Sequence, residues 1–250
     1  MSTVDPFAAA SGGARLAWLD EARGCAIVAM VLYHFVFDLE LFGLIAPTTA
    51  TTPPWSWLAT ATAGSFLFLA GISLGLAHAT RVKWAKALRR LLKIGGAALI
   101  ITVATYFSDP STFIFFGILH AIATFSLLGL VLLQLRLPPW GFLGLAGILF
   151  VGADLAWSPS FDHPALVWTG LFTTPPLTLD FEPLFPWAAP FALGIAAAAY
   201  LRGPLLQAGP LVGGALGRTL ARSGRHSLVI YLIHQPVLIA GLWLTLWVLG

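Results

Sequence analysis

Seven apolar segments, each close to the length that crosses a lipid bilayer as a helix, restrict this chain to a helical membrane bundle. A spanning helix needs about 20 residues, and the segments cover residues 17–45, 55–79, 88–107, 113–134, 139–157, 183–201 and 226–249. Only 9% of the residues are charged, whereas a soluble domain has about 25%. No strong two-residue alternation indicates a membrane barrel. We therefore predict an all-α, polytopic integral membrane bundle with about seven transmembrane helices.

The basic residues predict the orientation of this bundle. All thirteen Lys and Arg side chains lie at the start of the first segment, in alternate connections or at the start of the segment that follows such a connection, and cytoplasmic connections are the ones that collect Lys and Arg. The amino terminus is therefore expected in the cytoplasm and the carboxyl terminus outside. An eighth crossing within 158–182 would place four arginines outside, so the apolar patch at 165–172 is predicted to be re-entrant or interfacial.

The domain organisation follows from the same segments. Residues 1–14 are small and polar and are predicted to be a disordered cytoplasmic tail, followed by a single transmembrane domain over 15–250. The first apolar run is too long for a signal peptide and is expected to be retained. We expect a multi-pass protein of the bacterial inner (plasma) membrane.

Four ionisable side chains share one face of the first apolar segment. At about 100° per residue, Arg23, His34 and Asp38 all fall within about 60° of Asp20. Ionisable groups are costly in lipid and indicate a functional site by default. This stripe is therefore predicted to face the interior of the bundle.

The spacing within the stripe indicates what each group could do. His34 and Asp38 are four residues apart, so a carboxylate could orient the imidazole and suit it to general-base catalysis; the alternative is a histidine that only hydrogen-bonds a neighbouring helix. Asp20 and Arg23 fit either an ion pair that anchors the helix or a contact with substrate. Arg23 lies about 16 Å along the helix from His34, so it could hold an anionic donor group while His34 works deeper in the membrane.

The last apolar segment has a second narrow polar stripe, which contains Tyr231 and His234. Both are candidate oxyanion or substrate contacts, together with the neighbouring Gln235. The segment is preceded by Arg222 and Arg225, which could help a helix start to receive phosphate. The alternative is an ordinary helix start, because such signals are common and need no bound phosphate.

Three further residues are candidate substrate contacts. His120 lies in the fourth segment, where a packing histidine is almost as good an interpretation. Glu182 and Trp187 lie where the sixth segment begins and could form an acidic and aromatic rim for a sugar. An interfacial tryptophan belt would produce the same pattern.

No motif indicates a metal or a prosthetic group. The histidines lie on different segments without ligand spacing, and the chain has no HExxH, CxxC or glycine-rich phosphate loop. The net charge of +3 follows from membrane orientation, so we expect no nucleic-acid partner.

Several stretches resemble one known family. RLAWLDEARGCAIVAMVLYHFVFDL at 15–39 resembles the opening signature of the heparan-alpha-glucosaminide N-acetyltransferase catalytic domain and its prokaryotic relatives. FFGILHAIA, FPWAAPFALGI and GRHSLVIYLIHQPV are similar to later motifs of that group, although the last also occurs in the wider transmembrane acyltransferases. The ten residues between Arg23 and His34 are similar to the Arg-X10-His motif of the acyltransferase-3 group.

The resemblance implies transfer of an acyl group, usually acetyl from cytoplasmic acetyl-CoA, to a hydroxyl or amine of a glycan or lipid. By that match His34 would be catalytic and Arg23 would contact the donor. The chain lacks a counterpart of the luminal domain of the eukaryotic enzyme and has fewer helices, so an envelope sugar or lipid is expected in place of heparan sulfate.

Two other functions fit the residues less well. In a transporter or proton-coupled channel the stripe would be an ion path, but apolar side chains fill the interval between Arg23 and His34. In a structural or assembly protein of the envelope, the stripe would serve only folding or association. Membrane lipid is an expected partner in every case, and a homodimer is compatible with the sequence.

Overall fold

The computed structural model describes residues 16–249, within which all regular structure except one isolated β-bridge is helical. The seven long helices are α1 (Ala17–Leu41), α2 (Trp55–Ala77), α3 (Trp84–Ser108), α4 (Ile118–Gln134), α5 (Pro139–Ala156), α6 (Leu184–Tyr200) and α9 (Ser227–Leu249). They occupy the seven predicted segments, which confirms the all-α prediction. The predicted tail at 1–14 lies outside the described residues.

Four of these helices, α1, α2, α3 and α9, are long and apolar enough to cross a membrane. Helices α4, α5 and α6 are also apolar but shorter. The chain is thus an integral membrane protein by the length and composition of its helices, while the number of seven crossings remains a prediction.

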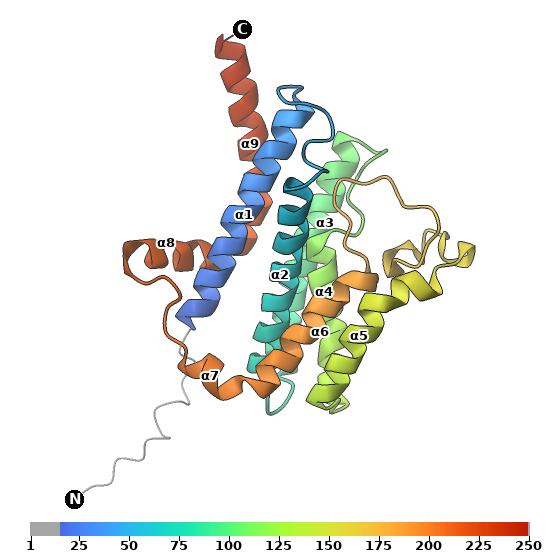
Figure 1. Ribbon diagram of the computed structural model, residues 1–250, viewed down its shortest axis with the longest axis vertical. Helices are drawn as coiled ribbons and strands as arrows, with labels where there is room; N and C mark the ends of the chain where they lie inside the picture. The colour runs from blue at the N-terminus through green and yellow to red at the C-terminus, as the bar shows by residue number, and fades with distance from the viewer. Residues whose placement is uncertain (1–15, 250) are drawn as a thin grey trace, which may run out of the picture.

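The long helices run up and down, so their connections gather at two ends (Figure 1). The connections 42–54, 109–117 and 157–183 lie at the upper end and contain no Lys or Arg. The connections 78–83 and 135–138 lie at the lower end and contain basic residues. This separation is what the predicted orientation requires, with the lower end in the cytoplasm.

The longest connection, 157–183, contains no helix long enough to cross a membrane. It contains two 3-10 turns, Pro159–Phe161 and Val167–Thr169, and the patch predicted to be re-entrant or interfacial forms the second of them. The connection is bound to residues 109–117 by hydrogen bonds from the Leu179 N–H to the Thr112 carbonyl (3.0 Å) and from the Glu182 N–H to the Phe116 carbonyl (3.0 Å). Its last residues are therefore held over the bundle.

Two short helices, α7 (Arg202–Gln207) and α8 (Gly214–Arg225), lie in a region that the sequence analysis treats as a connection. Helix α8 crosses α1 (Figure 1), and glycines permit the close approach, because a Cβ at Gly24 would collide with the Leu220 carbonyl. The Glu21 carboxylate accepts the N–H groups of Leu211 (2.5 Å) and Val212 (3.0 Å) just before α8. Helix α8 is thereby fixed to the lower half of α1.

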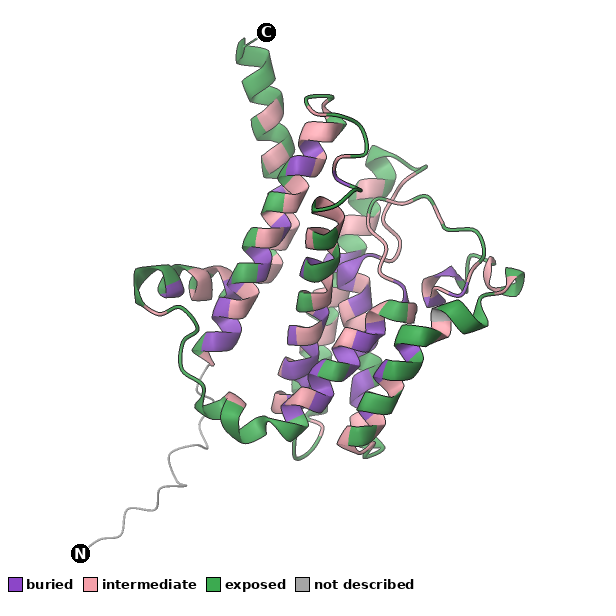
Figure 2. Cartoon of the chain, viewed as in Figure 1, coloured by how far each residue is buried: buried purple, intermediate pink, exposed green. Residues whose placement is uncertain are grey.

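The main core lies among α2, α4, α5 and α6, where Figure 2 shows most of the buried residues. Its largest fully buried side chains include Phe125, Phe142 and Ile195. Helices α2 and α6 approach most closely at Gly71 and Gly194, where an added Cβ would collide with the Phe191 and Phe68 carbonyls. In contrast, His234 is the one residue that α9 buries among its described residues, and exposed residues cover most of its carboxyl-terminal half (Figure 2).

We expect Gly71→Ala to destabilise the protein, because its methyl group would force α2 and α6 apart. Overpacking of this kind costs about 1–3 kcal/mol, which a thermal unfolding curve in detergent would resolve. The matched control is Gly64→Ala in the same helix, where an added Cβ meets nothing within 4 Å. Equal melting temperatures for the two variants would contradict the close α2–α6 packing.

Candidate active site

A cavity of about 550 Å³ opens among the lower parts of α1, α2 and α3 and the junction of α8 with α9. We call it the basic cavity, because five cationic side chains line it and Asp20 is its one lining carboxylate. The cations are Arg23, Lys86, Arg90, Lys93 and Arg225. Crowding so many like charges in a space of this size favours occupation by an anionic group.

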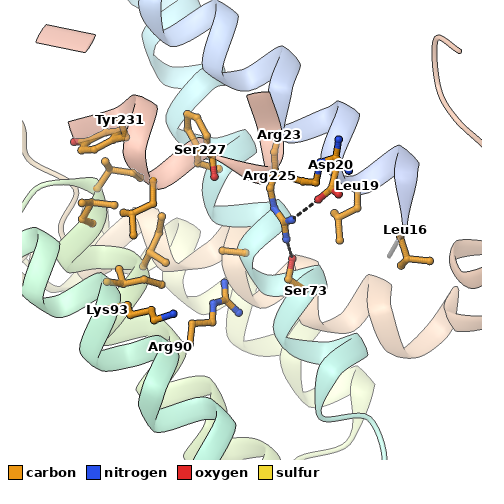
Figure 3. A pocket seen from close by; sticks show the side chains of 18 of the residues that line it. Leu16, Leu19, Asp20, Arg23, Ser73, Arg90, Lys93, Arg225, Ser227 and Tyr231 are labelled. Carbon is orange, nitrogen blue, oxygen red and sulfur yellow. Dashed lines mark hydrogen bonds and ion pairs between the residues drawn. The ribbon is translucent and has the colours of Figure 1, made fainter. Parts of the chain in front are cut away.

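Arg23 is the best anchored of these cations. Its guanidinium contacts the Asp20 carboxylate at 3.2 Å and donates to the Ser73 hydroxyl at 2.5 Å (Figure 3). The predicted ion pair between Asp20 and Arg23 is therefore present, and it also ties α1 to α2. Arg90 and Lys93 project from α3 on another side of the same cavity (Figure 3).

The basic cavity includes some predicted donor-site residues and adds others. Asp20, Arg23 and Arg225 line it, but Arg222 does not. Sequence reasoning assigned the α3 cations to membrane orientation alone. Their spacing was a usable signal, because residues 86, 90 and 93 follow a helical i, i+4, i+7 pattern that places them on one face.

The start of α9 also faces the basic cavity. Helix α8 ends at Arg225 and α9 begins at Ser227, which lines the cavity. This confirms the helix start inferred from the sequence. The first N–H groups of a helix have no partner within it and carry a partial positive charge, so they add to the attraction for an anion.

A second cavity of about 370 Å³ lies above the first. We call it the histidine cavity, because His34 of α1 and His234 of α9 both line it. The α1 residues that line it are Met30, Tyr33, His34 and Phe37, and their i, i+3, i+4, i+7 spacing defines one helical face. The predicted interior stripe of α1 is thus divided between two cavities.

The two histidines lie side by side, with ring centroids 4.8 Å apart. His234 Nδ1 lies 2.6 Å from the Tyr231 carbonyl oxygen. A carbonyl can only accept, so Nδ1 carries the hydrogen and Nε2 keeps its lone pair. In the neutral ring His234 is therefore arranged to accept a proton at Nε2, which has no partner among the described residues, and its contact with an oxyanion or substrate stays a prediction.

Asp38 does not orient His34 as the sequence suggested. Its Oδ1 accepts a hydrogen bond from the Gln235 side chain at 2.5 Å, which joins α1 to α9, and its Oδ2 has no partner among the described residues. Four-residue spacing permits contact on a helix, but an amide on the facing helix competes for the carboxylate. Asp38 is fully buried. It does not line the histidine cavity itself but contacts Gln235, which does.

Tyr231, predicted as an oxyanion or substrate contact, has a hydrogen-bond partner in the upper connection. Its hydroxyl donates to Asp180 Oδ2 at 3.2 Å, and its side chain lines both cavities. Asp180 and Glu182, in the upper connection, both line the histidine cavity. Glu182 was predicted as a rim residue, whereas Asp180 was not a candidate because nothing in the sequence places it beside α9.

Two predicted contacts lie elsewhere. His120 Nε2 lies 3.0 Å from the Thr102 hydroxyl, which itself donates to the Ile114 carbonyl at 2.8 Å, so this histidine joins α3 to α4. Trp187 packs against the main core. Neither lines either cavity, which favours the packing interpretation of both.

Buried polar atoms without a hydrogen-bond partner are concentrated at the histidine cavity. Seven side chains among the described residues contain such an atom, and five of them line this cavity, with Asp38 directly behind it. The five are His34, Thr62, Glu182, His234 and Gln235. An unpaired buried polar group is costly, so this concentration indicates a space made for a polar ligand.

The carboxyl groups of the upper connection are perturbed by their surroundings. Burial, and to a lesser degree the nearby Asp180 carboxylate, raises the pKa of Glu182 to about 9. Burial also raises the pKa of Asp180, against the lowering effect of hydrogen bonds from Ile118 and Tyr231. Glu182 is therefore protonated at neutral pH and can donate a hydrogen bond to a ligand.

No metal centre is formed within residues 16–249, because no three His, Cys, Asp or Glu side chains there are arranged to hold an ion.

The family described as "Heparan-alpha-glucosaminide N-acetyltransferase, catalytic" matches residues 15–236, a range that includes both cavities. Searches of curated proteins and of solved structures gave no match.

Glu182→Gln should change how stability depends on pH. Because the folded-state pKa is raised from 4.5 to about 9, the stability due to protonated Glu182 is complete below the unfolded value and is lost as the pH rises through the folded value. The amide cannot ionise, so the melting temperature of the variant should fall less than that of the wild type between about pH 6 and 9. Parallel declines of the two proteins would contradict the buried, protonated carboxyl group.

Proposed function

The chain belongs to the heparan-alpha-glucosaminide N-acetyltransferase catalytic family, and from that premise we propose that it is a membrane-embedded acyltransferase. The proposed reaction moves an acetyl or other short acyl group from cytoplasmic acyl-CoA to a sugar amine or hydroxyl of an envelope glycan or lipid. The observation that carries the proposal is the pair of adjoining cavities, one lined by cations and the other by imidazoles and carboxyl groups.

The basic cavity is the proposed donor site. Its five cations and the start of α9 would neutralise the phosphates of acyl-CoA. Its position at the Lys- and Arg-rich end agrees with a donor from the cytoplasm. Arg23, held by Asp20 and Ser73, is positioned in advance, so less ordering is needed when the donor binds.

The histidine cavity is the proposed site of transfer. The acceptor nitrogen or oxygen attacks the thioester carbonyl, the C–S bond breaks, and CoA leaves as a thiolate. His34 either removes the acceptor proton as general base or takes the acyl group itself and passes it on. In the first route the proton taken from the acceptor returns to the thiolate, and the lone pair of His234 Nε2, beside His34, offers it an intermediate position.

The acceptor is expected to come from the upper end. The groups it would meet there are the side chains of Asp180 and Glu182, with Tyr33 and Phe181 beside them. Carboxyl groups and aromatic rings are suited to hydrogen bonding and stacking with a sugar. A polar acceptor would also satisfy the unpaired buried atoms of this cavity.

A transporter is the rival function, and the junction between the cavities weighs against it. The three side chains common to both cavities are Phe66, Ile118 and Tyr231. An ion path needs polar groups that continue across the membrane, whereas two of these three are hydrocarbon. Proteoliposomes that carried a flux without consuming acyl-CoA would support the rival.

Replacing Arg90 should weaken donor binding. Arg90→Ala removes a half-buried cation from the basic cavity, and we expect the KM for acyl-CoA to rise about tenfold or more, the effect of one lost hydrogen bond between charged groups. The matched control is the preceding residue, because Arg89 is exposed and donates to the Ala85 carbonyl of its own helix. A KM raised equally by Arg89→Ala would argue against a specific donor site.

Replacing His34 should abolish transfer without abolishing donor binding. For His34→Ala we expect a rate lower by about 10²- to 10⁴-fold, the usual contribution of a general base, measured as labelled acetyl moving from acetyl-CoA into extractable glycan or lipid. His163→Ala, which removes an exposed histidine of the upper connection, should transfer at the wild-type rate. Wild-type transfer by purified His34→Ala protein would overturn the proposed function.

A further inference from the structure

The two cavities are separated by very little protein. Phe66 of α2, Ile118 of α4 and Tyr231 of α9 line both of them. We call these three side chains the partition. Anything that passes between the basic cavity and the histidine cavity, whether an acyl group or water, passes between these side chains.

Two members of the partition are bound to a single oxygen atom. Asp180 Oδ2 accepts the Tyr231 hydroxyl at 3.2 Å and the backbone N–H of Ile118 at 3.0 Å. Asp180 lies in the upper connection, and it reaches this point between α4 and α9 because residues 178–182 are hydrogen-bonded to residues 112–116. One carboxylate thus fixes both the tyrosine and the first residue of α4.

Gly117 makes this arrangement possible. A Cβ at that position would collide with the Asp180 carboxylate, so any larger residue would push the carboxylate away from Ile118 and Tyr231. The backbone of Gly117 is extended, with φ −86° and ψ −170°, so the need for glycine there is one of space and not of backbone conformation.

The geometry points to Asp180 as a positioning residue that holds Tyr231 across the passage between the donor and acceptor cavities. The inference rests on the proposed function and concerns how the acyl donor is protected from hydrolysis. Asp180 lines the histidine cavity, so an acceptor hydroxyl or amine that reaches it competes with the Tyr231 hydroxyl for the same oxygen. Arrival of the acceptor therefore loosens the partition, and the thioester meets the acceptor before it meets water from outside.

The first test separates transfer from hydrolysis. Tyr231→Phe keeps the ring and removes the hydroxyl that Asp180 holds. We expect hydrolysis of acetyl-CoA without acceptor, measured as free thiol released, to rise about fivefold, the factor given by loss of one ordinary hydrogen bond. The matched control is Tyr200→Phe at the exposed end of α6, which should hydrolyse at the wild-type rate.

A second pair of variants moves Asp180 without altering Tyr231. Gly117→Ala should also raise hydrolysis and lower the ratio of transfer to hydrolysis. Gly147→Ala in α5, where an added Cβ meets nothing within 4 Å, should leave the ratio unchanged. Asp180→Asn keeps an oxygen that can accept, so it should shift the ratio less than Gly117→Ala does.

A third measurement needs no enzymatic activity. In a Cys25→Ser background, Ser227→Cys places the one thiol in the basic cavity. A small, membrane-impermeant methanethiosulfonate added from the outer side should label it about fivefold faster when Tyr231→Phe is also present, and faster still with Tyr231→Ala. Equal labelling rates would overturn the partition even if acyl transfer were confirmed. Faster labelling of a protein that transfers no acyl group would support the partition while the proposed function failed.

Discussion

The arrangement depends on one constraint: an ionisable side chain cannot be left facing hydrocarbon. Helix α1 has Asp20, Arg23, His34 and Asp38 on one face, so that face has to meet protein or a polar space. The structure provides both, because Arg23 and His34 reach cavities while Asp38 meets Gln235 of α9. The rest of the bundle is placed around this requirement. Helix α8 crosses the lower half of α1, and α9 runs against the upper half.

In the proposed function the two cavities divide the work that an acyl transfer requires. The lower one concentrates positive charge beside a helix start, which is the environment that binds phosphates. The upper one brings imidazoles and carboxyl groups together in a partly enclosed space, where proton transfer and hydrogen bonding would be stronger than in water. Because α1 lines both, the distance between Arg23 and His34 along one helix sets the distance between donor binding and chemistry. A single rigid element thereby fixes the register of the two halves of the reaction.

Periodicity predicted much of this from the sequence, and long-range packing accounts for most of what it missed. Apolar length located all seven long helices, and helical spacing placed His34, Tyr231 and His234 at the interior. The predicted contact of Asp38 with His34 was wrong. The carboxylate instead contacts Gln235, which is 197 positions away in sequence, and local spacing cannot detect a partner so distant. Lys86, Arg90 and Lys93 were missed because membrane orientation already explained their charge. Asp180 and Gly117 come together only because the connections 109–117 and 157–183 are hydrogen-bonded to each other. No local sequence pattern predicts that pairing.

The exposure of α9 has a consequence for where this protein can work. Helix α9 contributes Tyr231, His234 and Gln235 to the site, yet His234 is the only residue that it buries within the described chain. Its carboxyl-terminal half is mostly exposed apolar surface, including Trp243 and Trp247, which are 61% and 70% exposed, and in a bilayer this surface would meet acyl chains. The helix that holds His234 would therefore also be in contact with lipid. Because a helix can tilt when the bilayer changes in thickness, a tilt of α9 would change the distance between the His34 and His234 rings.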